Sequence, residues 1–343
     1  MRTIYSPDQL LHDPLGEINR GALVPPYECP RRATGVIDAV RAAKCGPIDD
    51  AAAFPRAAIL RIHPEHYVDF LTRAHGEWAA AGRAGDAIPL ASPIRGFRSD
   101  RIPASLDGRL SYYSFDISTP ITAGTWTAVR RTADVALTGA QMIADGHDRA
   151  VFSLCRPPGH HAGIDFFGGY CFINNAAIAA QYLRDAGAAR VAILDIDYHH
   201  GNGTQQIFYD RADVLYVSIH ADPATDFPYF LGYADERGQG AGEGFNHNLP
   251  LPQGIGWRAY SAALDAAIAT VRTFGADALI VSLGLDGFER DSLSHFRLQA
   301  EDYVRIGAAL GRIGLPTVLL FEGGYAIDDI GALVVNVLRG FES

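Results

Sequence analysis

Residues 191–200 read VAILDIDYHH, an apolar run that ends in carboxylates and imidazoles. Two later apolar runs end in a similar way, because Asp286 follows 279–283 and the sequence EGGY, ending at Tyr325, follows 317–321. Short apolar runs separated by helical stretches are typical of a parallel sheet in an α/β protein. Active sites of such sheets lie beyond the carboxyl ends of the strands. We therefore expect these separated segments to meet at one place.

The remaining chain fits one doubly wound α/β domain over residues 1–343, with a mostly parallel sheet and helices on both faces. The predicted strands are 2–6, 58–61, 151–154, 191–194, 214–219, 279–283 and 317–321. The predicted helices are 31–43, 64–81, 126–144, 174–186, 204–209, 257–274, 301–313 and 327–341. Long irregular stretches are expected at 7–30, 82–125 and 221–256. Loops of this length are often functional, and we expect the first two to shape the site entrance.

Composition argues against several classes of function. The net charge of −10 disfavours nucleic-acid binding, which depends on basic patches, and is compatible with steering a cationic ligand. No run approaches the roughly 18 apolar residues of a membrane span. The first residues show no signal-peptide apolar region, so we expect a cytoplasmic protein without a membrane partner. The cysteines form no C-x-x-C pair, which predicts reduced, partly buried thiols at Cys29, Cys45, Cys155 and Cys171.

Alternate polar positions follow the strand at 191–194, namely Asp195, Asp197 and His199. Side chains two residues apart in a strand point to the same face, so these three share a side if the extended geometry persists. Crowded carboxylates and an imidazole repel one another, and Zn²⁺ or a similar divalent ion relieves that cost. Asp286 is the candidate ligand from another strand, which leaves an open position for substrate. The structural alternative is that these aspartates cap helices or turns.

Two further segments carry candidate proton donors and acceptors. His160 and His161 follow a Pro-Pro-Gly turn that could expose both rings. Imidazole titrates near working pH, so tandem histidines beside a metal strand are best explained as proton-transfer groups. Tyr325 follows two glycines at a strand end, where its hydroxyl could donate to an oxyanion. The alternative for this tyrosine is ordinary packing in the core.

Taken together, these segments resemble the histone deacetylase superfamily, which has the arginase-like α/β fold. The matching pieces are RPPGHH at 156–161, DIDYHHGNG at 195–203, SIH at 218–220, GLD at 284–286 and EGGY at 322–325. Other pieces look like the bacterial acetylpolyamine amidohydrolases within that superfamily. These are LVPPYE at 23–28, FGGYCFINN at 167–175, and the segment from Asp222-Pro223 to FLGYA at 230–234. The similarity covers essentially the whole chain.

The resemblance implies a role for each matching residue. Asp197, His199 and Asp286 match ligands of a catalytic Zn²⁺, with Fe²⁺ or Co²⁺ as alternatives in the cell. The implied catalytic residues are the general base and acid His161, its electrostatic neighbour His160, the carboxylate Asp195 paired with His160, the ring-orienting Asn202, and the carbonyl-polarising Tyr325. A structural K⁺ is also implied, at Asp195, Asp197, His199, Ser218 and Ile219.

Substrate contacts are implied as well. Tyr170 and Phe227 match the aromatic walls of the acyl tunnel, together with Gly169 and Leu293. Glu17 and Asp107 match acidic positions near the polyamine site, in loops that in these relatives narrow the tunnel mouth across a homodimer. The alternative for both acids is ordinary solvated loop residues. Two departures are Gly287, where the family commonly has threonine, and residues 290–293, which lack the usual proline.

Several functions remain open at this point. The first is hydrolysis of acetylated polyamines or related small cationic acylated amines, and the second is removal of acetyl groups from protein lysines. A binuclear ureohydrolase of the arginase type needs an aspartate two residues before the last ligand, where this chain has Gly284. A catalytically silent acyl-amine sensor would lack a ligand or Tyr325, and neither is missing.

Overall fold

The computed structural model describes residues 1–93, 96 and 98–343. Its strands within the main sheet are β1 (Arg2–Tyr5), β4 (Ile48–Asp50), β5 (Ala150–Ser153), β6 (Val191–Asp195), β7 (Val214–Ala221), β8 (Asn246–Leu251), β9 (Ala278–Leu283) and β10 (Thr317–Phe321). These eight strands lie in the order β4-β1-β5-β10-β9-β6-β7-β8, and every neighbouring pair is parallel. All carboxyl ends therefore meet at one edge of the sheet.

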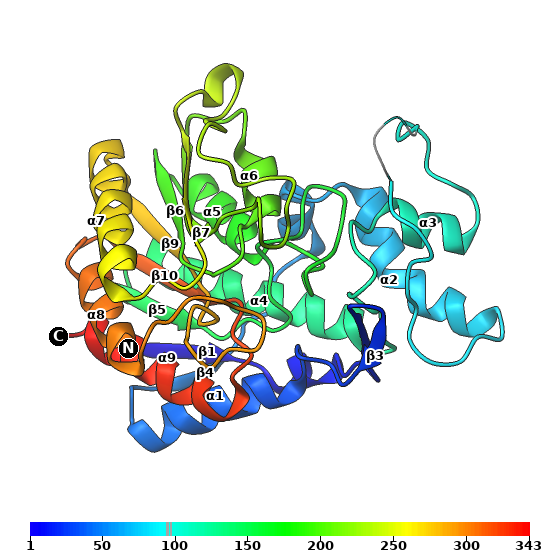
Figure 1. Cartoon of the computed structure of the whole chain (residues 1–343), viewed down its shortest axis with the longest axis horizontal. Helices are drawn as coiled ribbons and strands as arrows, with labels where there is room; N and C mark the ends of the chain where they lie inside the picture. The colour runs from blue at the N-terminus through cyan, green and yellow to red at the C-terminus, as the bar shows by residue number, and fades with distance from the viewer. Residues whose placement is uncertain (94–95, 97) are drawn as a thin grey trace.

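Helices cover both faces of this sheet (Figure 1). They are α1 (Pro30–Ala43), α2 (Glu65–Ala80), α3 (Leu106–Tyr112), α4 (Thr125–Ala144), α5 (Asn175–Asp185), α6 (Asn202–Phe208), α7 (Trp257–Phe274), α8 (Ala300–Gly311) and α9 (Ile327–Phe341). One core cluster joins the sheet to α1, α7, α8 and α9, and a second joins its other face to α4, α5 and α6. This confirms the predicted doubly wound α/β fold.

The central strands β6, β7, β9 and β10 are buried along their whole length. Strands that are covered on both faces read as continuous apolar runs rather than alternating ones. That is why the sequence shows them so clearly, and why the first polar residues after each run lie at the sheet edge.

Helices α2 and α3 lie beyond the end of the sheet, at the right of Figure 1. They share a third core cluster with the outer sides of α4 and α5, in which Tyr67, Phe70, Tyr113 and Phe167 pack together. This projection is built from the chain between α1 and α4, which includes the predicted loop 82–125. Residues 94, 95 and 97 of that loop lie outside the described residues.

Several predicted elements were wrong. The strand expected at 58–61 is part of a 3₁₀ helix, Arg56–Arg61, because a run this short has no periodicity that separates strand from helix. The stretch 7–30 contains a 3₁₀ helix (Pro7–Leu11) and the antiparallel hairpin β2 (Glu17–Asn19) and β3 (Ala22–Val24). The short helix α3 lies inside 82–125, and β8 lies inside 221–256. β8 is an edge strand with the polar sequence NHNLPL, so it gives no apolar signal.

The helices and the cysteines bear on two expectations drawn from composition. Within the described chain, no helix combines the length and apolarity that crossing a membrane requires. The four cysteines are free, as predicted, and three of them are buried.

Candidate active site

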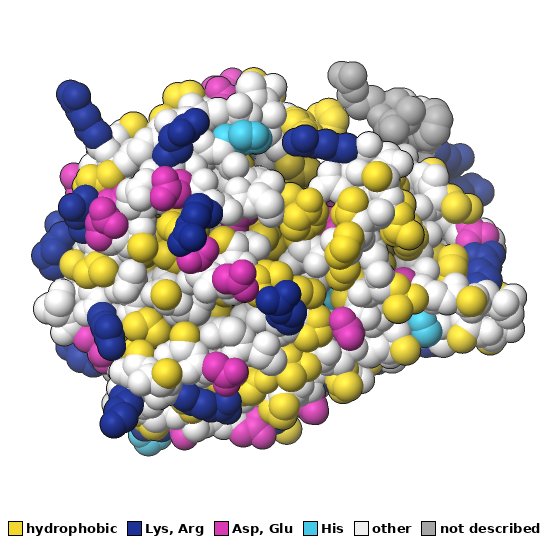
Figure 2. Space-filling model, turned by 60° about the horizontal axis from the view of Figure 1, so that its bottom comes forward, with side chains coloured by type: hydrophobic (Ala, Val, Ile, Leu, Met, Phe, Trp, Pro, Cys, Tyr) yellow, Lys and Arg dark blue, Asp and Glu magenta, His cyan; other side chains and the backbone are white. Residues whose placement is uncertain are grey.

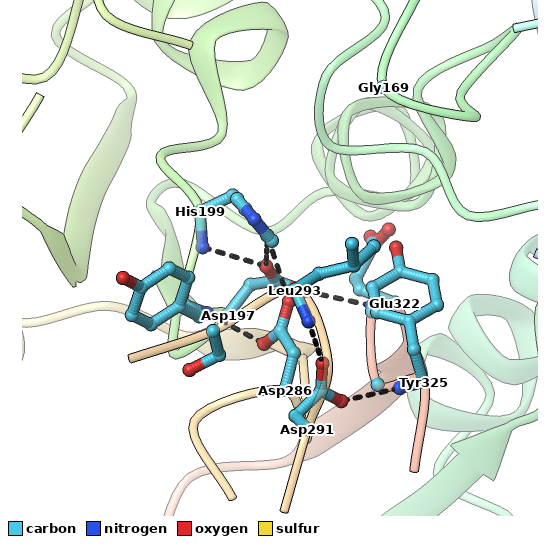
Figure 3. Close-up of polar contacts among 12 residues, drawn as sticks. Gly169, Asp197, His199, Asp286, Asp291, Leu293, Glu322 and Tyr325 are labelled. Atoms are coloured by element: carbon cyan, nitrogen blue, oxygen red, sulfur yellow. Dashed lines mark hydrogen bonds and ion pairs between the residues drawn. The ribbon is translucent and has the colours of Figure 1, made fainter. Parts of the chain in front are cut away.

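The three predicted metal ligands meet at the carboxyl edge of the sheet. β6 and β9 are parallel neighbours that place Asp195 opposite Ser282. Asp197 and His199 follow β6, and Asp286 follows β9. Their ligand atoms lie within 4.8 Å of one another, and Figure 3 shows the three side chains turned toward a common point. Residues 87 positions apart in sequence therefore form one donor set.

This donor set is costly without a cation. Nδ1 of His199 lies 2.9 Å from Oδ2 of Asp286 and 3.4 Å from Oδ1 of Asp197. Burial and the nearby Asp197 carboxylate raise the pKa of Asp286 to about 7. Burial disfavours the charged imidazole of His199, but the two carboxylates outweigh that cost and raise its pKa to about 10. A divalent cation would relieve this crowding, so the residues present fit the predicted metal.

Backbone groups and a glycine hold the ligands in place. Oδ2 of Asp197 accepts the N–H of Gly323 at 2.8 Å, and Oδ1 of Asp286 accepts the N–H of Tyr198 at 2.8 Å. A Cβ at Gly284 would lie 2.1 Å from Oδ2 of Asp197. An aspartate at 284, which the arginase alternative requires for its second metal, would therefore collide with the first ligand.

The tandem histidines lie beside this set and have opposite surroundings. Nδ1 of His160 lies 3.0 Å from Oδ2 of Asp195, whereas Nδ1 of His161 lies 2.7 Å from Oδ1 of Asn202. Burial lowers the pKa of His160, but the carboxylates of Asp197 and Asp195 outweigh burial and raise it to about 10. Burial and the neighbouring His160 hold the pKa of His161 well below its usual value. The surroundings therefore favour the charged form of His160 and the neutral form of His161.

Tyr325 is held in the cavity wall by its backbone and its ring. Its N–H donates to Oδ2 of Asp291 at 2.6 Å, a contact drawn in Figure 3. The guanidinium of Arg32 lies 4.8 Å from the centre of the Tyr325 ring, and its Nε donates to the carbonyl of Gly324 at 2.7 Å. Arg32 is itself buried against Glu28 at 3.1 Å. The Gly-Gly-Tyr segment is therefore fixed by residues that lie far away in sequence.

Two buried carboxylates in this site were missed by the sequence analysis. Asp291 accepts the N–H groups of Tyr325, Ala326 and Leu293, at 2.6, 3.2 and 2.9 Å. Glu322 accepts the N–H of Gly159 at 2.6 Å and that of His160 at 3.2 Å. Both carboxylates bind backbone groups of other loops, and no local sequence pattern predicts such contacts. The one available signal for Glu322 was its place at the carboxyl end of a buried strand.

A cavity of about 550 Å³ opens above the ligand set. Eight of the predicted site residues line it, namely Glu17, His161, Gly169, Tyr170, His199, Phe227, Leu293 and Tyr325. The ring centres of His161 and Phe227 lie 5.2 Å apart, and those of Tyr170 and Tyr325 lie 5.6 Å apart. The cavity is therefore walled by aromatic rings next to the histidines.

Gly169 is required for this wall. Its φ is +54°, and a Cβ there would lie 2.3 Å from Cδ2 of His161. Its N–H donates to Asp116 at 2.5 Å, which anchors the turn that carries Tyr170. A side chain at this position would push the His161 ring out of place.

Glu17 lies in this cavity wall, and its carboxylate accepts two hydrogen bonds from the protein. Its oxygens accept the hydroxyl of Tyr170 at 2.8 Å and the N–H of Tyr27 at 3.1 Å. Burial raises the pKa of Glu17 to about 7, against the lowering effect of those hydrogen bonds. A cationic partner would stabilise the charged form of this carboxylate, which burial disfavours.

Asp107 lies elsewhere. It belongs to the first turn of α3 and forms a two-pronged ion pair with Arg83, with 2.8 Å between Nη2 and Oδ2. It does not line the described cavity of the single chain. The substrate role assigned to it from the sequence stays a prediction.

Two of the predicted potassium ligands, Asp195 and Ser218, lie side by side on β6 and β7. Asp195 pairs directly with Ser218 in the parallel register, and Ile219 follows in β7. Both Asp195 and Ser218 are buried. The side chain of Asp195 accepts the N–H of Asp197 at 3.1 Å and the hydroxyl of Tyr216 at 3.0 Å.

Known proteins with similar sequences belong to the family that the resemblance predicts. The sequence model of the histone deacetylase domain matches residues 26–341. Acetylpolyamine amidohydrolase 2 of Pseudomonas aeruginosa is 55% identical over 342 residues, which cover 100% of this chain and 99% of that protein. Acetylpolyamine amidohydrolase of Mycoplana ramosa is 47% identical over 340 residues, with 99% of each covered.

Solved structures agree. The crystal structure of acetylpolyamine aminohydrolase from Burkholderia pseudomallei has a TM-score of 0.95 and 40% identity, and the alignment covers 100% of this chain and 99% of that one. The HD domain of HDA15 has a TM-score of 0.81 and 28% identity, covering 100% and 91%. The chain belongs to the histone deacetylase family. The predicted family, fold and class of enzyme, a deacetylase, are confirmed.

Proposed function

We propose that this protein is a zinc-dependent amidohydrolase that removes acetyl groups from acetylated polyamines or other small acylated amines, releasing acetate and a free amine. The observation that carries the proposal is a single cavity lined by His161, His199 and Tyr325 and also by the carboxylate of Glu17. The full-length relatives whose names are acetylpolyamine amidohydrolase support the same substrate class.

Asp197, His199 and Asp286 would hold the Zn²⁺, or Fe²⁺ or Co²⁺ in its place. Such an ion, when bound, polarises an amide carbonyl and lowers the pKa of a water from about 15.7 toward about 7. The chain provides one such site here, because Gly284 has no room for a further ligand.

His161 acts as the proton-transfer residue. Asn202 accepts from its Nδ1, which leaves Nε2 as the basic nitrogen. Because its pKa is held low, His161 is neutral and can take the proton of the attacking water. It then returns that proton to the departing amine. His160 contributes the positive charge that Asp195 and Asp197 sustain.

Tyr325 acts as the hydrogen-bond donor to the oxyanion. Burial keeps the pKa of its hydroxyl well above the usual value, so the hydroxyl retains its proton. Donors that are already in place when charge develops are worth most to the rate. The backbone contacts from Asp291 and the ring contact from Arg32 provide this placement.

The alkyl chain of the amine would pass between Tyr170 and Phe227, with Gly169 and Leu293 completing the wall. A free acetylated diamine carries a distal ammonium, and the acid in the wall that offers it charge and hydrogen bonds is Glu17. Asp116 and Asp226 add two more acidic side chains to the cavity lining, and Arg20 adds one basic side chain. A lysine in a protein does not present a distal ammonium in the same way, so this lining favours the small amine over the protein-deacetylase alternative.

We extend the proposal to a structural K⁺ at Asp195, Asp197, His199, Ser218 and Ile219, and to a homodimer formed through 7–30 and 82–125. Apolar side chains are exposed on these segments and near the cavity, including Leu15, Leu23, Leu90 and Phe230. Figure 2 shows hydrophobic side chains spread over the centre and right of the face in view. In a dimer, Asp107 of one chain would reach the rim of the other.

A substrate panel tests the proposal. We expect higher kcat/KM for acetylputrescine and acetylcadaverine than for acetyl-lysine peptides with the same metal-loaded protein. A strong preference for the peptides would support the protein-deacetylase function instead. If no acetylated amine were turned over, the proposed enzymatic function would be wrong.

A further inference from the structure

A second group of metal-binding side chains lies behind the cavity wall. A ring nitrogen of His160, Sγ of Cys171 and a carboxylate oxygen of Glu322 lie within 4.8 Å of one another. All three side chains are buried. Imidazole, thiolate and carboxylate are the ligand types that bind Zn²⁺ and similar thiophilic ions. Neither Cys171 nor Glu322 has a place in the chemistry described above.

Glu322 provides the independent sign of a ligand. Its Oε2 accepts two backbone N–H groups, from Gly159 and His160. Its Oε1 is buried and has no hydrogen-bond partner among the described residues. A buried carboxylate oxygen without a partner is expensive, so this oxygen gains more than most from a cation.

His160 is oriented as a metal ligand. Its Nδ1 lies 3.0 Å from Oδ2 of Asp195, which leaves Nε2 as the nitrogen available to a metal ion. A histidine held by a carboxylate through its other nitrogen is the usual arrangement at metal sites, because it fixes the ring and raises its basicity.

Cys171 connects the group to the cavity. Its thiol donates to the carbonyl of Gly169 at 3.3 Å, and Gly169 itself lines the cavity. The thiol therefore lies directly behind the part of the cavity wall that Gly169 forms.

We propose that His160, Cys171 and Glu322 form a second, inhibitory site for a thiophilic divalent ion. On binding, bonds form from the ion to Nε2, Sγ and Oε1, and the S–H bond breaks. The thiol proton, and the proton on Nε2 of His160, leave to solvent, as metal binding to such ligands requires. No electron is transferred. An ion at Nε2 of His160 lies beside Asp197, since those two groups are 3.8 Å apart, so turnover falls.

The test titrates protein that already holds one equivalent of Zn²⁺ with Cd²⁺ alone. We expect a second equivalent to bind, with a thiolate-to-metal charge-transfer absorption in the ultraviolet and a loss of turnover of about tenfold or more. Cys171→Ser should bind only the first equivalent, keep its basal turnover, show no absorption and escape the inhibition. Glu322→Gln should weaken binding of the second equivalent, and it serves as the informative variant if Cys171→Ser does not fold.

Cys155→Ser is the matched control, because Cys155 is equally buried but lies outside the group. It should behave like the unaltered protein. In Asp286→Ala the absorption should persist although turnover is absent, which separates this site from the proposed function. Binding of one equivalent only, or unchanged absorption and inhibition in Cys171→Ser, would overturn the proposal.

Discussion

The carboxyl edge of the sheet and the entrance of the cavity hold their acidic side chains in different ways. At the edge, Asp197, Asp286 and Asp291 each accept backbone N–H groups from neighbouring strands or loops. At the entrance, Glu17 accepts one backbone N–H from its own loop, that of Tyr27, and the hydroxyl of Tyr170, and Asp107 pairs with one arginine of its own segment. The chemistry is thus fixed by the sheet, whereas the choice of amine is left to loops that can change without disturbing it.

The comparison predicts the largest effect for a metal ligand. Asp286→Ala removes one of the three proposed metal ligands, so we expect kcat to fall by about a thousandfold or more. Metal analysis after dialysis should show the catalytic ion falling from one per chain to less than one. Gly284→Ala should have a similar effect, because its Cβ would collide with Asp197. Two catalytic ions per chain in the unaltered protein, or full activity in Asp286→Ala, would refute the mononuclear site.

The next largest effect is expected at Tyr325. Tyr325→Phe keeps the ring over Arg32 but removes the hydroxyl that donates to the oxyanion. We expect kcat to fall by about 10²–10³ while KM stays nearly constant, because the contact is made only in the transition state. Steady-state kinetics on an acetylated diamine measure both constants. An unchanged kcat would mean that Tyr325 only packs in the core and has no role in the reaction.

A smaller loss is expected at Asp291, which acts as a positioning residue. Asp291→Asn turns one of the two accepting oxygens into an NH2 group, which donates and cannot accept, so the backbone groups held by Asp291 lose part of their hold. Misplacement of a donor lowers kcat by roughly tenfold to hundredfold. The double variant with Tyr325→Phe provides the control. A positioning role predicts little further loss in that background, whereas equal losses in both backgrounds would mean that Asp291 only supports the fold.

The same contrast explains how much could be predicted from the sequence. Asp197, His199 and Asp286 were predictable because each follows an apolar run, and parallel strands bring their ends together. Asp291, Glu322 and Arg32 were not, because their partners are backbone groups far away in sequence. The missed strands β4 and β8 lie at the sheet edges. They are short or polar because one side of an edge strand has no strand partner to bury it.

Residues at the entrance were predictable only through the family resemblance. Glu17 does line the cavity, yet nothing in its local sequence distinguishes it from a solvated loop acid. Asp107 was expected near the same polyamine site; in the single chain it pairs with Arg83, and its substrate role stays a prediction. Loop geometry is set by tertiary contacts, so spacing carries little information there.

A selective and pH-dependent effect is expected at Glu17. Its pKa of about 7 means that the carboxylate is charged above neutrality and protonated below it. Glu17→Gln should lower kcat/KM for charged acetylated diamines by about five- to thirtyfold, as a loss of 1–2 kcal/mol requires. In the unaltered protein, kcat/KM for the diamine should fall more steeply from pH 8 to pH 6 than kcat/KM for a neutral acylated amine of equal length. Parallel pH profiles for the two substrates would contradict a cation-binding role.

The smallest effect is expected at Asp107, and it depends on the proposed dimer. The side chain is partly exposed and paired with Arg83. Pairs near the surface contribute little, so Asp107→Ala should lower kcat/KM for the charged diamine by less than about fivefold. Arg83→Ala is the matched variant, since it breaks the same pair but leaves the carboxylate free. If Asp107 attracts the distal ammonium at the rim of a partner chain, the two variants should shift the preference for charged over neutral substrate in opposite directions. If the pair only stabilises α3, both variants should lower activity on the two substrates alike, and the rim role assigned to Asp107 would be wrong.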